Sequence, residues 1–102
     1  MPVAASRLAG YNFSMPDVAP AIRVRVLFFG RLKEIAGHAE EFVDIPEGAA
    51  MEELFARCVA RQPELGRFRA SLVASRNQEF VPWGTPLRSG DEIAFLPPVS
   101  GG

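Results

Sequence analysis

Residues 23–30 read RVRVLFFG, and their alternating side chains predict a β-strand that Gly30 ends. Val24, Val26 and Phe28 fall on one face of this strand. The side chains on the opposite face are Arg23, Arg25, Leu27 and Phe29. One face is therefore wholly apolar and suited to a core, whereas the other mixes arginine with large apolar side chains.

Two short elements follow this strand. Residues 31–36 predict a single helical turn before Gly37, and residues 41–45 predict a second strand that ends at Pro46. If the connection between the strands is tight, the second strand pairs antiparallel with the first.

Residues 50–61 form the most distinct helix of the chain. Its apolar side chains recur at intervals of three and four residues, which places them in one stripe: Met51, Leu54, Phe55, Cys58 and Val59. Pro63 stops the helix because it cannot donate a backbone hydrogen bond. The start is poorly capped, since Gly48, Ala49 and Ala50 offer no side-chain oxygen to the free amides.

The last third of the chain predicts three more strands, at residues 71–75, 79–81 and 92–96. Asn77-Gln78 is a turn between the first two of them, and residues 83–87 are a loop with Gly84 and Pro86 as breakers. The order β-β-α-β-β-β predicts an α+β fold: a mixed sheet with one main helix packed on one face.

The second face of this sheet is unusually apolar. If Val24, Val26 and Phe28 point at the helix, then Leu27, Phe29 and Leu96 point away from it, and Phe80 joins them. The outer face of such a sheet is normally polar, so an apolar patch there indicates a partner surface.

Composition limits the function classes. The 102 residues fit one domain, and a formal net charge of −1 predicts no general attraction to nucleic acid or anionic lipid. Cys58 is the only cysteine, which excludes an internal disulfide and suits a reducing cytoplasm. No apolar run approaches the length of a membrane span. Residues 1–21 show no lasting periodicity and are predicted to be a disordered extension, with Met15 as a possible alternative start.

The chain ends on a thin tip. Residues 92–96 run directly into Pro97-Pro98, Val99-Ser100 and the terminal pair Gly101-Gly102. Glycine has no Cβ and can enter a slot that any side chain would block. Residues 97–102, fully extended, reach about 20 Å. We therefore predict a domain over residues 22–96 with a flexible tail over 97–102, whose terminal carboxylate is the reactive group.

Several stretches of residues 22–102 resemble the small subunit of molybdopterin synthase, a family of sulfur carriers with the ubiquitin-like β-grasp fold. The matching stretches are residues 26–29, the helix after Ile45-Pro46, Asn77-Gln78, Pro86-Leu87 and residues 90–93. The most specific is residues 95–102, FLPPVSGG. The N-terminal extension has no counterpart in the family. Arg76 stands where the family usually has a small apolar residue, which leaves the inward or outward phase of the third strand open.

The resemblance implies a chemistry for Gly102. A ubiquitin-activating-type adenylyltransferase would activate its carboxylate with ATP and magnesium, and a sulfur donor protein would leave a thiocarboxylate. The tail would then insert into the large synthase subunit, in a heterotetramer of two small and two large subunits. There sulfur would pass to a cyclic pyranopterin phosphate. This chain would bind no cofactor itself, and Phe29, Phe80 and Leu96 would supply the docking patch.

Two other functions remain open. The sulfur carrier of thiamine biosynthesis has the same fold and Gly-Gly end but lacks the Pro-Pro-Val-Ser spacer. A plain β-grasp binding module would need no reactive tail. Cys58 and His38 are interpreted as structural rather than functional residues. Cys58 lies on the apolar stripe of the helix, and His38 has no second ligand at the spacing of a metal site. Trp83 with Phe80 lacks the basic groove of a nucleic-acid site.

Overall fold

The computed structural model describes residues 20–97. The predicted extension therefore lies outside the described residues except for its last two positions, and so do Pro98, Val99, Ser100, Gly101 and Gly102. Ala21 already belongs to the first strand, one residue before the predicted start of the domain.

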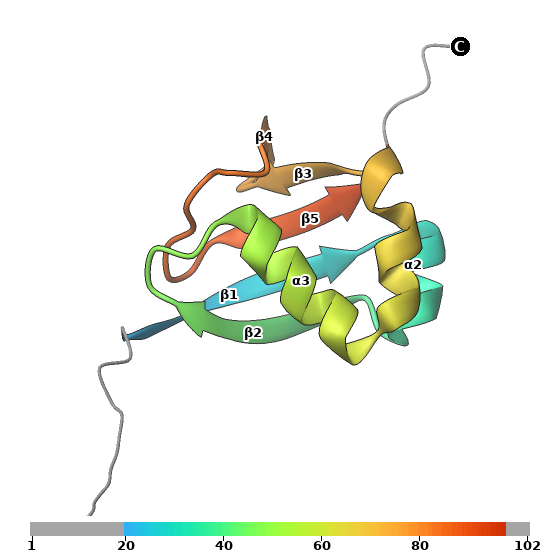
Figure 1. The fold of residues 1–102 in the computed structure, drawn as a ribbon, viewed down its shortest axis with the longest axis horizontal. Coiled ribbons are helices and arrows are strands. Elements are labelled where there is room, and N and C mark those ends of the chain that lie inside the picture. Colours follow the sequence, from blue (N-terminus) through green and yellow to red (C-terminus); the bar gives the residue numbers. More distant parts are fainter. Residues whose placement is uncertain (1–19, 98–102) are drawn as a thin grey trace, which may run out of the picture.

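Five strands make one mixed sheet (Figure 1). They are β1 (Ala21–Phe28), β2 (Glu40–Pro46), β3 (Val73–Arg76), β4 (Glu79–Val81) and β5 (Glu92–Leu96). The strand order is β2-β1-β5-β3-β4, in which β1 and β5 run parallel and the other neighbours antiparallel. The predicted α+β class and the antiparallel pairing of the first two strands are confirmed.

The helices are α2 (Gly30–Ala36), α3 (Met51–Arg61) and the 3-10 helix η1 (Pro63–Ser71). Both α-helices were predicted, although α2 is longer than one turn. The third strand was wrong at its start, because Ser71 ends η1 and β3 begins at Val73. Proline is tolerated in a first helical turn, so Pro63 ends α3 and also begins η1. Among the described residues, none of these helices is long and apolar enough to cross a bilayer.

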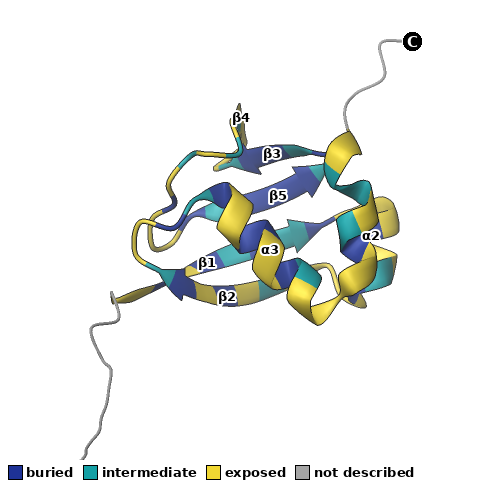
Figure 2. Ribbon diagram, in the orientation of Figure 1, coloured by how far each residue is buried: buried dark blue, intermediate teal, exposed yellow. Residues whose placement is uncertain are grey.

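Helix α3 crosses one face of the sheet and buries four of the five residues of its predicted stripe there, while Val59 is partly buried (Figure 2). Val24, Val26 and Phe95 are fully buried beneath the helix. The ring of Phe95 stacks on Trp83, with centroids 5.7 Å apart, and meets Phe55 edge-on at 4.9 Å. Offset and edge-on aromatic pairs of this kind add to the free energy gained by burial. The core therefore centres on β5, the strand that leads into the tail.

The start of α3 is better satisfied than the sequence predicts. The amides of Met51 and Glu52 donate to the carbonyls of Thr85 and Trp83, at 2.9 and 3.0 Å. The amide of Ala50 donates to the side chain of Glu53 at 2.9 Å. Carbonyls from a distant loop thus replace the missing capping side chain.

The hairpin between β3 and β4 fixes the phase of β3. Asn77 and Gln78 both have positive φ, 51° and 73°, as the two-residue turns that match strand twist require. Ala74 pairs with Phe95 and so faces the core, whereas Ser75 pairs with Ala94 on the outer face. The phase that Arg76 left open is therefore settled.

Candidate functional site

The tail leaves the domain at the end of the sheet next to α2. Because β1 and β5 are parallel, their carboxyl ends meet at this edge, and Phe28 pairs with Phe95 (Figure 1). Phe29 and Leu96 therefore follow side by side. Pro97, the last described residue, is exposed. The lining of a cavity of about 260 Å³ here is mainly apolar: Phe29, Gly30, Arg31, Leu32, Phe68, Leu72 and Pro97.

A row of side chains crosses the face of the sheet that α3 leaves open. Its register runs Leu27, Ala94, Ser75 and Phe80, from β1 through β5 and β3 to β4. The side chains of Ala94 and Ser75, in the middle of this row, are small and protrude little, whereas Phe80 at the edge is 66% exposed. This face is therefore a shallow surface with large apolar side chains at its borders.

The structure brings Phe29 and Leu96 of the predicted docking patch together, beside Pro97, and separates Phe80 from them. Phe29, which is 47% exposed, lies with half-buried Leu96 and exposed Pro97 at the tail end. Phe80 shares their face, but on the far edge strand and level with Ala94 rather than Leu96. The remaining predicted residues, from Pro98 to Gly102, lie outside the described part of the chain.

Sequence reasoning missed one exposed aromatic residue. Phe42 is 60% exposed and pairs with Arg25 across β1 and β2, so it belongs to the open face. Its signal was available in the sequence. Residues 41–45 alternate, so Val43 and Ile45 can be buried only if Phe42 points outward.

Ion pairs occupy the half of the open face that is away from the tail. Arg25 contacts both Glu40 and Glu92, the latter at 3.0 Å. Arg23 donates to Asp44 at 2.9 Å, and this hydrogen bond lowers the pKa of Asp44. On β1 and β5, the side chains of this face that lie near the tail take part in no ion pair within the described part of the chain. This end of the face is therefore the part that we expect to dock to a partner.

The other reactive side chains of the described region do not form a site. Cys58 is buried, and desolvation raises the pKa of its thiol to about 11, which keeps it protonated and unreactive near neutrality. His38 Nε2 lies 2.6 Å from Glu41 Oε1. Within residues 20–97, no group of three or more histidine, cysteine or acidic side chains could hold a metal ion.

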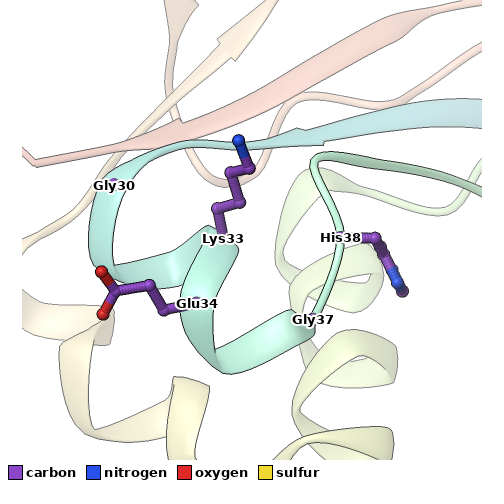
Figure 3. Close-up of a pocket in the computed structure, with 5 residues that line it drawn as sticks. All are labelled: Gly30, Lys33, Glu34, Gly37 and His38. Carbon is purple, nitrogen blue, oxygen red and sulfur yellow. The ribbon is translucent and has the colours of Figure 1, made fainter.

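A hollow of about 640 Å³ around α2 offers no converging chemistry. It is lined by Gly30, Lys33, Glu34, Gly37 and His38. Figure 3 shows that Lys33, Glu34 and His38 point in three different directions. A catalytic site needs side chains that meet at one reacting atom. This hollow is therefore a surface feature rather than an active site.

The topology of the sheet and the position of α3 define the ubiquitin-like β-grasp class. Residues 26–102 match the ThiS family, and the chain belongs to that family. The chain is 37% identical over 83 residues to the molybdopterin synthase sulfur carrier subunit of Chlamydomonas reinhardtii, covering 79% of this chain and all of the relative.

Two solved structures are also similar. The small archaeal modifier protein 1 of H. volcanii is 26% identical, with a TM-score of 0.70, covering 76% of this chain and 99% of that chain. A protein–protein complex of subunits 1 and 2 of the molybdopterin-converting factor from Helicobacter pylori contains a chain that is 29% identical. Its TM-score is 0.58, and the match covers 79% of this chain and all of that chain.

Proposed function

We propose that this chain is the sulfur carrier for molybdopterin synthesis, with the Gly102 carboxylate as the group that carries sulfur. The observation that carries the proposal is the family match, which continues through the Gly101-Gly102 end. Similar proteins named molybdopterin synthase sulfur carrier subunits support the choice of pathway.

The chemistry begins with activation by another protein. A carboxylate resists nucleophilic attack because it is charged and resonance-stabilised, so an adenylyltransferase joins AMP to Gly102 from ATP, releasing pyrophosphate. Magnesium serves that partner and not this chain. A sulfur donor protein then displaces AMP and leaves a thiocarboxylate. Glycine at positions 101 and 102 lets the reacting carbon be approached closely, because no Cβ crowds it.

Delivery depends on insertion of the tail into the large synthase subunit, where sulfur passes to a cyclic pyranopterin phosphate. Pro97 and Pro98 favour an extended conformation, which lowers the entropy lost on insertion. Val99 and Ser100 would contact the walls of the passage in the large subunit into which the tail inserts. Phe29 and Leu96 would dock at the entrance of this passage, with Phe80 as a second contact. The H. pylori complex of subunits 1 and 2 supports a partner of this kind.

The thiamine-pathway carrier is the main alternative, since the ThiS family match does not separate it. Co-purification distinguishes them: a synthase large subunit supports molybdopterin, and a thiazole synthase supports thiamine. Both pathways fit the cytoplasmic location that we propose, in which Cys58 stays reduced.

Intact mass spectrometry tests the loading step. The chain is incubated with its activating enzyme, ATP, magnesium and a sulfur donor, and the reaction without ATP is the control. We expect the mass to rise by the exchange of one oxygen for one sulfur at Gly102. An unchanged mass under conditions that load a known carrier would refute sulfur carriage and leave a plain binding module.

A charged residue in the docking patch should weaken binding to the large subunit. Phe29→Glu places a carboxylate in the apolar border beside Leu96, and we expect the dissociation constant to rise by about tenfold or more. Ala56→Glu is the matched control, since Ala56 is exposed on α3, across the sheet from the patch. Isothermal titration calorimetry measures the dissociation constant of each variant. Equal affinity of the two variants would show that the large subunit does not dock at Phe29.

A further inference from the structure

Strand β2 is an edge strand with backbone groups that have no strand beside them. The amide of Phe28 donates to Ala39 and the amide of Glu47 to Pro20, both at 2.8 Å. Hydrogen-bonded pairs alternate along an antiparallel ladder, so Glu41, Val43 and Ile45 bond toward β1. The backbone N–H and C=O groups that point away from β1 are therefore those of Glu40, Phe42 and Asp44.

This edge is long for an unprotected one. Natural sheets usually blunt their edges with short strands, proline or charged side chains, especially lysine. The charged side chains of β2 are all acidic, and each is paired with an arginine of a neighbouring element. The opposite edge strand, β4, has three residues, whereas β2 has seven and meets proline only at Pro46. Phe42 stands exposed at its centre. The strand is therefore free to accept another strand.

A groove runs along this edge between β2 and α3. One part, of about 350 Å³, is lined by Phe42, Val43, Asp44, Arg57, Ala60 and Arg61. A second part, of about 270 Å³, is lined by Ala36, His38, Glu41, Phe42, Arg61 and Gln62. Because both parts share Phe42 and Arg61, they form one continuous groove, which we call the β2 groove.

The two walls of the β2 groove differ in charge. On the strand wall, the two acidic residues are Asp44, which is paired with Arg23, and Glu41. Glu41 is paired with Arg61 of the helix wall. Arg57 is exposed and has no acidic side chain within salt-bridge distance among residues 20–97. The helix wall therefore favours an acidic ligand.

We propose that the β2 groove binds an extended acidic peptide segment of another protein, which adds to the sheet as a sixth strand. Successive side chains of a strand point to opposite faces. The bound segment would thus alternate acidic side chains toward Arg57 and Arg61 with apolar side chains toward Phe42. Main-chain hydrogen bonds to Phe42 and Asp44 supply affinity, and the alternation supplies specificity. This site is separate from the tail and independent of sulfur carriage.

Charge disfavours a second copy of this chain as the occupant. In an antiparallel pair of β2 strands centred on Phe42, Glu40 of one copy would face Asp44 of the other. The two α3 helices would also bring Arg57 and Arg61 toward their own counterparts. Like charges placed opposite each other across strands are destabilising. A foreign segment can keep its acidic side chains on the α3 face, away from Glu40 and Asp44, which share the opposite face with Phe42.

Peptide titration followed by amide NMR tests the proposal on the full chain. The probe is a synthetic peptide of alternating valine and glutamate, long enough to span β2, and its control replaces glutamate with lysine. We expect the glutamate peptide alone to shift the amide signals of Phe42, Asp44 and Arg57. A peptide with alternate amides N-methylated, which cannot complete the ladder, should not bind. No shift, or equal shifts with the lysine peptide, would overturn the proposal.

Variants and size measurements sharpen this test. Arg57→Glu should weaken binding of the glutamate peptide by about fivefold or more, since it replaces attraction by repulsion. Arg88→Glu, an exposed arginine outside the groove, is the matched control and should bind as the unaltered chain does. Light scattering of the free chain should show a monomer; a dimer that Phe42→Pro abolishes would mean that β2 pairs with itself.

Discussion

Adding one alanine after Gly102 should abolish sulfur transfer while leaving the free energy of unfolding unchanged. The added residue moves the terminal carboxylate by about 3.3 Å and puts a Cβ where the slot admits none. A misplacement of 1 Å at a reacting centre can already cost about a hundredfold in rate. Deletion of Gly102 should have the same effect, because the carboxylate then stops short of the reacting atom.

The experiment compares three proteins in a reconstituted synthase reaction: the unaltered chain, the chain with alanine after Gly102, and the chain with alanine before Met1. The third carries the same added mass at the other end and should transfer sulfur at the normal rate. Urea titration shows whether all three share one stability. Normal transfer by the protein extended after Gly102 would show that the terminus is not the reacting group.

Periodicity predicted the parts of this fold that depend on neighbouring residues. The stripe on α3 and the alternation of β1 reappear in the structure because a helix and a strand each repeat over a few residues. Helix η1 escaped prediction because its burial rests mainly on one residue, Leu65, and shows no periodic stripe. The cap of α3 escaped too, since Trp83 and Thr85 come from a loop distant in sequence.

The candidate site shows the same division. Alternation placed Phe29 and Leu96 on one face, but their adjacency follows from the parallel pairing of β1 and β5. That pairing joins the two ends of the described chain, and no local pattern encodes it. The same register separates Phe80 from them. The terminal residues of the site remain a prediction from sequence, because the structure describes the chain only to Pro97.

Replacement of Phe95 by alanine should cause the largest loss of stability of any single change considered. Phe95 is fully buried, stacks on Trp83 and meets Phe55 edge-on. Truncating such a residue removes the free energy of burial and leaves a cavity, together about 3–5 kcal/mol. Domains of this size have roughly 5–15 kcal/mol in total, so Phe95→Ala would stand close to unfolding.

Phe80→Ala is the matched control, since Phe80 is 66% exposed and its loss should change stability by only about 0.5 kcal/mol. Phe95→Leu, which keeps most of the volume, should cost about 1 kcal/mol and remain measurable if Phe95→Ala does not fold. Urea unfolding of the three variants gives the order. Equal stability of Phe95→Ala and Phe80→Ala would mean that the aromatic cluster does not hold β5. A rigid base for the tail would then have to come from elsewhere, because β5 is the strand from which Pro97 emerges.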